Sequence, residues 1–245
     1  MRIDKLLANM GYGTRKEVKK ILKTGIVRVD ATPIKDPKTH VNPETQEVTV
    51  HGEVVEYRQY IYLVMNKPQG LISATEDAEE MTVVDILEPD DQLFEPFPVG
   101  RLDKDTEGLL IITNDGKLTH QLLSPKKGIG KRYFAVIEGE VTEEDRKTFE
   151  QGVTLDDGYV TKPATLDILS SGSTSEIEVV ITEGKYHQVK RMFESVGKKV
   201  TFLKRLSMAG LELDEDLEPG EYREMNDEEL SFLREQVAQS KNSDM

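Results

Sequence analysis

The chain has 245 residues and a formal net charge of −14 at pH 7, and its 37% of hydrophobic residues include no run near the ~20 residues that span a bilayer. It contains no Cys, which excludes disulfides, thiolate nucleophiles and Cys-based zinc sites, and its four His lack the spacing of paired metal ligands. The first residues, MRIDKLLANMGYG, carry charges within their apolar stretch and no small-residue cleavage site. We therefore expect a soluble, cytoplasmic protein of two domains with no metal centre and no membrane partner.

The two ends of the chain carry opposite charge. Residues 1–40 hold ten basic residues against four acidic ones, a local charge of +6. Residues 210–245 hold twelve acidic residues against three basic ones, a local charge of −9. The basic end indicates a surface that faces a polyanion, although a solvated helical face explains the same charges equally well. The acidic end has no clear role in this pattern.

Two helices and a strand are predicted at the start of the chain. Apolar residues recur at helical spacing up to Gly11, and a second helix begins with the capping box Thr14-x-x-Glu17 and ends at Gly25. A short strand, residues 26–29, follows. The second helix turns a basic side outward, formed by Arg15, Lys16, Lys19, Lys20 and Lys23.

A larger α+β domain is predicted after a linker near residues 56–59. Strands are expected at residues 60–65, 109–112, 133–137 and 176–181, and Leu203 and Leu206 belong to a last strand pattern. Helices are expected after the caps Thr142 and Asn226 and between Gly184 and Gly197. Strands and helices do not alternate strictly, which favours a largely antiparallel mixed sheet. The predicted domains are a small α/β module at 1–57, a second domain at 58–236 and a flexible polar tail at 237–245.

The charged loop that precedes the strand at 109–112 is the strongest candidate for chemistry. It runs GRLDKDTEG from Gly100, and such loops at the mouth of a sheet often hold catalytic groups on a rigid scaffold. From the residue types alone, Asp103 and Asp105 could be a metal-binding pair, part of a charged surface loop, or a nucleophile with a structural neighbour.

The segment Gly100-Arg-Leu-Asp-x-Asp-Thr-x-Gly-Leu-Leu110 resembles the signature motif of the pseudouridine synthases that modify ribosomal RNA. Three more segments agree in order with that family: Asn66-Lys-Pro-x-Gly70, Lys131-x-Tyr133, and residues 183–193, EGKYHQVKRMF. The sequence of the last segment is similar to that of the RsuA branch, which acts on 16S small-subunit rRNA. Residues 1–50 resemble the S4-like RNA-binding domain that the same branch carries, and the likeness extends to about residue 230.

The resemblance implies an activity and a small set of catalytic residues. Such an enzyme flips one uridine out of the RNA, here uridine 516 of 16S rRNA, and isomerises it to pseudouridine without a cofactor. Asp103 would be the essential aspartate, acting either by attack on the sugar or by removal of a proton. Because a carboxylate in a closed pocket needs a cation to stay ionised, Arg191 is its expected partner, and Tyr133 would stack on the uracil ring.

The remaining candidates for contact with substrate and RNA are Arg101, Leu102, Lys67, Lys131, Lys190, Leu203, Arg15, Lys16 and Lys19. Arg101 would fill or hold the space that the flipped base leaves. The lysines suit phosphate contacts but are also ordinary surface residues, and core packing accounts for Leu203 equally well. Ribosomal RNA or a small-subunit assembly intermediate is the expected partner of a monomeric enzyme.

Three other functions compete with this interpretation. One is a non-catalytic, ribosome-associated RNA-binding factor with a decayed enzyme body. Another is a metal-dependent phosphoryl-transfer enzyme that uses Asp103 and Asp105, although no phosphate-cradling Gly-rich motif supports it. The third is a synthase of the same family that acts on large-subunit rRNA.

Overall fold

A computed structural model describes residues 1–240, and the chain divides into two compact units. The first unit consists of Met1–Ile61 together with Leu87–Pro96, and the second consists of Tyr62–Ile86 and the residues from Phe97 onward. The sequence analysis places a single boundary after residue 57. The units divide the chain differently because residues 87–96, which include α3 (Pro89–Gln92), return to the first unit: the side chain of Leu93 approaches Gly11 there.

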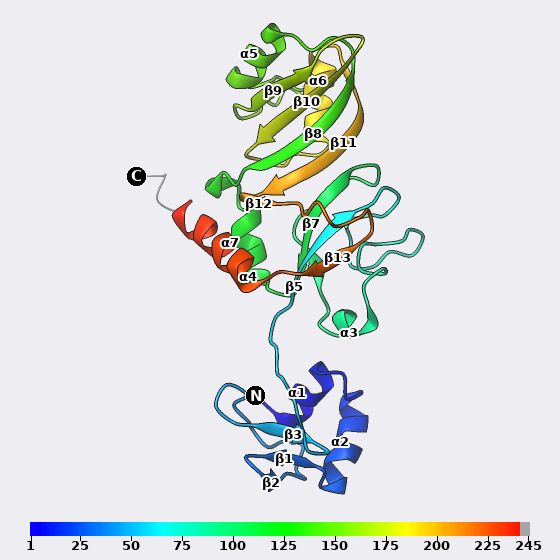
Figure 1. Ribbon diagram of the computed structural model, residues 1–245, viewed down its shortest axis with the longest axis vertical. Helices are drawn as coiled ribbons and strands as arrows, with labels where there is room; N and C mark the ends of the chain where they lie inside the picture. Colours follow the sequence, from blue (N-terminus) through cyan, green and yellow to red (C-terminus); the bar gives the residue numbers. More distant parts are fainter. Residues whose placement is uncertain (241–245) are drawn as a thin grey trace. The chain divides into compact units, whose positions relative to one another are not determined.

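The first unit packs two helices against a small antiparallel sheet. The helices are α1 (Ile3–Asn9) and α2 (Arg15–Thr24), and the strands β1 (Val27–Val29), β2 (Thr32–Pro33), β3 (Val48–Val50) and β4 (Glu53–Val54) lie in the order β2-β1-β3-β4 (Figure 1). Apolar side chains from both helices and the sheet form one core. The capping box that the sequence predicts at the start of α2 is confirmed.

The second unit is an α+β domain, as predicted. Its strands are β5 (Tyr62–Lys67), β6 (Phe97–Pro98), β7 (Glu107–Thr113), β8 (Lys131–Glu138), β9 (Thr165–Ser170), β10 (Thr174–Ile181), β11 (Lys199–Met208), β12 (Leu211–Glu212) and β13 (Tyr222–Glu224). Its helices are α4 (Gly116–Leu123), α5 (Glu143–Gln151), α6 (Gln188–Ser195) and α7 (Asp227–Gln239), with a 3₁₀ turn at Pro125–Lys127. The caps predicted at Thr142 and Asn226 are present.

The largely antiparallel sheet predicted for this domain is confirmed. Its main path runs β13-β5-β7-β11-β8-β10-β9 (Figure 1). Outside this path, β6 pairs with β7 and β12 pairs with β11. Among the strand pairs of the described chain, β7 and β11 are parallel and the others are antiparallel. Helix α6 packs against β11, which brings its residues toward the loop that leads into β7.

Gly108 explains how β7 and β11 approach each other so closely. Its φ is +102°, and a Cβ at this position would lie 2.2 Å from the carbonyl oxygen of Arg205 on β11. A side chain at Gly108 would therefore separate the two strands at the point where the loop that carries Asp103 enters the sheet.

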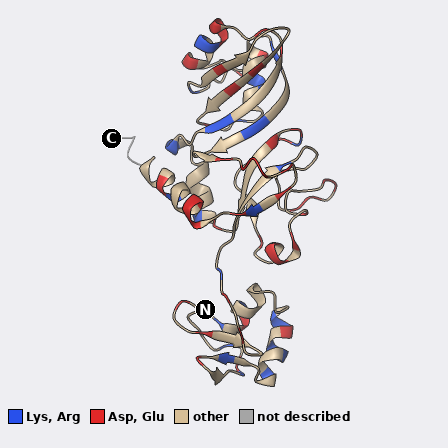
Figure 2. Ribbon diagram, viewed as in Figure 1, with Lys and Arg blue, Asp and Glu red and all other residues tan. Residues whose placement is uncertain are grey.

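The described part of the acidic C-terminal segment, through residue 240, is folded rather than loose. Helix α7 continues through Gln239, and its Leu233 and Val237 are buried in the core of the second unit. The predicted tail is wrong for residues 237–239, because Val237 packs on the core, while residues 241–245 of that prediction lie outside the described residues. Figure 2 shows basic residues along α2 and acidic residues along α7.

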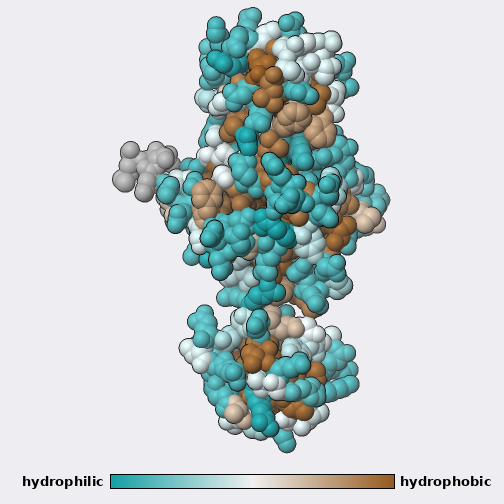
Figure 3. Space-filling model, in the orientation of Figure 1, coloured by the Kyte–Doolittle hydropathy of each residue, from teal (hydrophilic) through white to brown (hydrophobic). Residues whose placement is uncertain are grey.

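The face of each unit that Figure 3 shows is mostly hydrophilic, with scattered apolar side chains. No helix in residues 1–240 is long and apolar enough to cross a membrane.

Candidate active site

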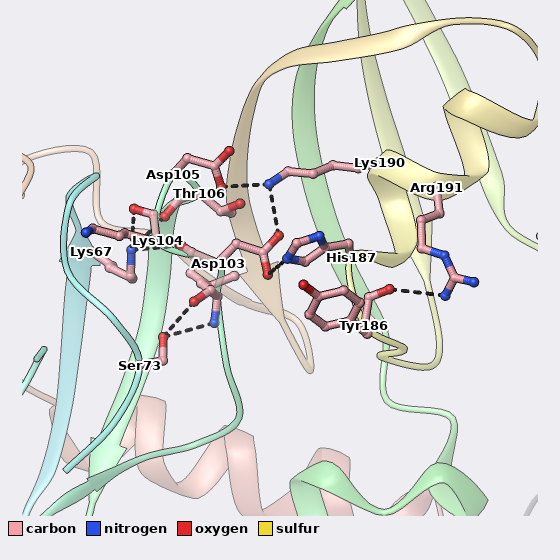
Figure 4. A network of polar contacts seen from close by, with 11 residues as sticks. Lys67, Ser73, Asp103, Lys104, Asp105, Thr106, Tyr186, His187, Lys190 and Arg191 are labelled. Carbon is pink, nitrogen blue, oxygen red and sulfur yellow. Dashed lines mark hydrogen bonds and ion pairs between the residues drawn. The ribbon is translucent and has the colours of Figure 1, made fainter. Parts of the chain in front are cut away.

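The loop that carries Asp103 is fixed by main-chain hydrogen bonds. Ser73 Oγ accepts a hydrogen bond from the Leu102 amide and donates one to the Leu102 carbonyl, both at 3.0 Å. The Thr106 amide donates to the Asp103 carbonyl at 3.0 Å, which closes the turn before β7 (Figure 4). Leu102 is itself buried. The loop therefore presents the Asp103 side chain from a preorganised backbone.

Lys67, at the end of β5, holds this loop from beneath. Its side chain is fully buried, and its ammonium donates to the carbonyls of Pro68 and Thr106 at 3.0 Å and of Asp103 at 3.1 Å. Burial lowers the pKa of Lys67 to about 8, while the nearby carboxylates of Asp105 and Asp103 partly offset that effect. The expected phosphate contact is therefore wrong for Lys67, because its ammonium is buried, bound to main-chain carbonyls and out of reach of RNA.

The Asp103 carboxylate lies next to two side chains of the EGKYHQVKRMF segment (Figure 4). Its Oδ2 is 3.0 Å from Lys190 Nζ, and its Oδ1 is 3.5 Å from His187 Nε2. The side chain of Asp103 remains 28% exposed, so a ligand can reach it. Lys190 also binds Asp105 at 2.6 Å, so one ammonium bridges both carboxylates of the loop.

Lys190 and Asp105 shift each other's pKa. Burial alone would lower the pKa of Lys190, but its hydrogen bonds to Asp105 and Asp103 outweigh that effect and raise it. Burial would raise the pKa of Asp105, but the hydrogen bond and charge of Lys190 lower it. Lys190 is therefore a permanent cation at neutral pH, and the phosphate contact predicted for it is replaced by these two carboxylates.

Arg191 does not contact Asp103, which corrects the pairing expected from the sequence. Its Nε donates to Asp156 at 2.7 Å, and its Nη2 lies 2.7 Å from Asp157. Successive residues of a helix point about 100° apart, so Lys190 faces Asp103 while Arg191 faces the turn at residues 156–157. Arg191 Nη1 also donates to the Tyr186 carbonyl at 3.4 Å. Arg191 therefore joins two loops rather than supplying the cation for Asp103.

Tyr133 lies on β8, the strand next to β11 in the sheet. It is paired with Arg205 across β8 and β11, and both side chains are buried, with 7% and 2% exposed. Arg205 Nε donates to the Leu109 carbonyl at 2.7 Å, which ties β11 to the strand that follows the Asp103 loop. Leu203 is buried and paired with Ala135, so it lies on the same face of the sheet as Tyr133. The roles expected for Tyr133 and Leu203 stay predictions.

Lys131, at the start of β8, is partly buried. Its ammonium is 3.3 Å from the Ile129 carbonyl, and burial lowers its pKa to about 8, with a further lowering from the charge of Arg205. Contact between Lys131 and phosphate stays a prediction.

Replacing Lys131 by methionine is expected to change how stability depends on pH. An unfolded lysine titrates near ~10.4, so between pH ~8 and ~10 the unfolded chain binds a proton that the folded chain lacks, and the contribution of Lys131 to the free energy of unfolding rises by about 1 kcal/mol per pH unit. Urea unfolding of wild type and Lys131→Met at pH about 7.5, 8.5 and 9.5 measures this. Lys67 is present in both proteins and cancels. The free energy of unfolding of wild type minus that of Lys131→Met should rise with pH. A value that falls or stays constant would contradict the prediction.

The other predicted RNA contacts lie on the surface. Arg101 is exposed beside the buried Leu102. Arg15, Lys16 and Lys19 are exposed along α2 of the first unit, so the basic helix does face outward as the sequence predicts.

The metal-binding interpretation of Asp103 and Asp105 loses its basis, because Lys190 Nζ lies between the two carboxylates. Within residues 1–240, no group of three or more His, Asp and Glu is arranged to hold a metal ion.

Sequence reasoning assigned no role to Ser73, His187 or Tyr186. Ser73 carries no local signal, because its function depends on a contact with Leu102 across 29 residues. His187 and Tyr186 lie inside the segment that carries the family resemblance, but their residue types do not show which of its side chains face Asp103.

Comparison with known proteins agrees with this geometry. Residues 61–195 match the family model "RNA pseudouridylate synthase", and residues 1–56 match that of the S4 domain. The chain is 57% identical over 239 residues to the "Uncharacterized RNA pseudouridine synthase YtzG" of Bacillus subtilis, an alignment that covers 97% of this chain and 100% of that protein. It is 37% identical over 241 residues to the "Ribosomal small subunit pseudouridine synthase A" of Vibrio cholerae, with 95% and 99% covered. A solved structure described as "Crystal structure of pseudouridylate synthase" superposes with a TM-score of 0.67 at 32% identity, covering 95% of this chain and 99% of that one.

Proposed function

The chain belongs to the RNA pseudouridylate synthase family and begins with an S4 domain, and we propose that it converts one uridine of 16S small-subunit rRNA, uridine 516, into pseudouridine. The observation that carries this proposal is the Asp103 carboxylate, which is partly open to ligands and held at 3.0 Å from the Lys190 ammonium in a rigid loop. The small-subunit target is supported by the name of the Vibrio cholerae relative.

The reaction is an isomerisation, so uridine and pseudouridine contain the same atoms. The bond between the sugar and N1 of uracil breaks, the base turns, and a new bond forms between the same sugar carbon and C5. The proton of C5 leaves and N1 gains one. Asp103 supplies the anionic group at the sugar, either by attacking it or by removing a proton beside the anomeric carbon. Lys190 supplies the positive charge beside the Asp103 carboxylate, the position expected for Arg191 from the sequence.

The base reaches Asp103 only after it leaves its stack in the RNA. Unstacking costs a few kcal/mol and is easiest for an unpaired uridine. Tyr133 stacks on the uracil, Leu203 lines the pocket under it, and Arg101 holds the vacated space in the RNA. Arg15, Lys16 and Lys19 on α2 contact phosphates, which their exposure supports.

The test is to map pseudouridine in rRNA that lacks it, after treatment with wild-type protein or Asp103→Asn. Naked 16S rRNA, a partly assembled small subunit and 23S rRNA are treated in parallel, without added metal. We expect a single new pseudouridine, at uridine 516 of 16S rRNA, with wild type only.

Other outcomes would redirect the proposal. Modification of 23S rRNA alone would move the target to the large subunit. If neither rRNA is modified in naked or assembled form, the enzyme does not act on rRNA, and a role as a ribosome-associated binding factor replaces the proposal. We also propose that the protein acts in the cytoplasm and as a monomer. Sedimentation of the purified chain with and without RNA would check the monomeric state.

A further inference from the structure

Tyr186 is an exposed aromatic residue beside the proposed catalytic group. Its side chain is 76% exposed, and its ring stacks on that of His187 with 3.8 Å between centroids and 17° between planes. His187 in turn lies 3.5 Å from Asp103 through its Nε2 (Figure 4). One face of the Tyr186 ring is therefore covered by His187, while the other faces solvent.

The backbone around this pair is held in place. The Lys185 amide donates to Gln188 Oε1 at 2.9 Å, and Gln188 Nε2 donates to the buried Glu183 at 2.9 Å. His187 adopts a left-handed conformation with φ of +49°, which is unfavourable for a residue with a side chain and persists only where its surroundings enforce it.

The exposed ring makes little contribution to packing, so folding does not explain its position. Unpaired nucleotides bind proteins by stacking on aromatic rings, and a rigid ring loses little entropy when a base covers it. The Tyr186 ring has a fixed position and one face open to solvent, beside the catalytic aspartate of an RNA enzyme. It is therefore suited to stack on such a base.

We propose that Tyr186 is the stacking site for an unpaired nucleotide adjacent to the target uridine in the RNA strand. This inference rests on the proposed function. The base on Tyr186 is not the one that reacts, because the reacting uracil stacks on Tyr133 in the proposed function. The neighbouring nucleotide stacks on Tyr186 and so strengthens the binding of the RNA next to Asp103. The site accepts any base, because every base has an aromatic face.

Steady-state kinetics on a 16S rRNA fragment that contains uridine 516 tests the proposal. Tyr186→Ala is expected to raise KM about tenfold and leave kcat within about twofold, because only binding of the neighbour is lost. Tyr186→Phe keeps the ring and should keep the KM. Leu169→Ala, at a side chain that is 55% exposed on β9, is the control for removal of an exposed apolar group. An unchanged KM in Tyr186→Ala, or a loss confined to kcat, would overturn the proposal.

Abasic substitution in the RNA identifies the nucleotide. With wild type, a fragment that lacks the base on one side of the uridine should show the same rise in KM as Tyr186→Ala, and the two changes together should not add. If the effects of Tyr186→Ala and of base removal on KM are fully additive for both neighbours of the uridine, the proposal is overturned.

A binding measurement separates this inference from the proposed function. Asp103→Asn is mixed with single-stranded RNA that carries 2-aminopurine next to a uridine, and stacking should quench its fluorescence. The quenching should vanish in Asp103→Asn combined with Tyr186→Ala. Quenching that survives in the double variant excludes Tyr186 as the stacking site. If wild type modifies no rRNA, the proposed function fails while this result still decides the role of Tyr186.

Discussion

Replacing Asp103 by asparagine should abolish pseudouridine formation, with a fall in the single-turnover rate of about 10⁴-fold or more. The amide has the shape of the carboxylate but neither its charge nor its ability to attack the sugar or take a proton. The hydrogen bonds that position the loop involve the main chain of residues 102 and 103, so the fold and RNA binding should remain intact. Rate and RNA affinity are measured on the same fragment.

Asp105→Asn is the matched control for this variant. Asp105 shares the Lys190 ammonium, but its side chain is 69% exposed, so its replacement removes a mostly solvated charge. We expect a rate within about tenfold of wild type. A larger loss in Asp105→Asn than in Asp103→Asn would exchange the roles of the two aspartates. A nearly active Asp103→Asn would remove Asp103 from the mechanism.

Replacing Lys190 by methionine should lower kcat about 100-fold, because it removes the charge-assisted hydrogen bond that holds the Asp103 carboxylate in place. The KM for RNA should change little, because the Lys190 ammonium is bound to carboxylates rather than facing phosphate. Steady-state kinetics on the 16S rRNA fragment measures both effects.

Arg191→Met tests the alternative pairing. It removes a cation one position further along the same helix, but Arg191 binds Asp156 and Asp157, so we expect a smaller loss of kcat. If Arg191→Met instead lowers kcat about 100-fold and Lys190→Met does not, Arg191 is the partner of Asp103 in the reacting enzyme and the contact with Lys190 is secondary.

The local features of this protein could be read from its sequence. The capping boxes at Thr14, Thr142 and Asn226 and the buried strand after the Asp103 loop depend on residues a few positions apart, and the structure confirms them. The same holds for the outward basic side of α2, which follows from helical spacing. Helix α4 was missed, because its cap Asp115 stands in a segment, Asn-Asp-Gly, that is equally typical of a turn.

The sequence by itself determined the two-module organisation, the mixed α+β class, the RNA pseudouridine synthase family and the loop in which Asp103 lies. Only the tertiary structure decided which side chains meet there. Lys190 rather than Arg191 reaches Asp103 because neighbouring helix residues diverge by about 100°, and the angle at which α6 meets the sheet selects one of them. Contacts between segments far apart in the chain bury Lys67 beneath the Asp103 loop and leave the Tyr186 ring exposed. Local spacing specifies elements, whereas the direction of a functional side chain depends on how those elements pack.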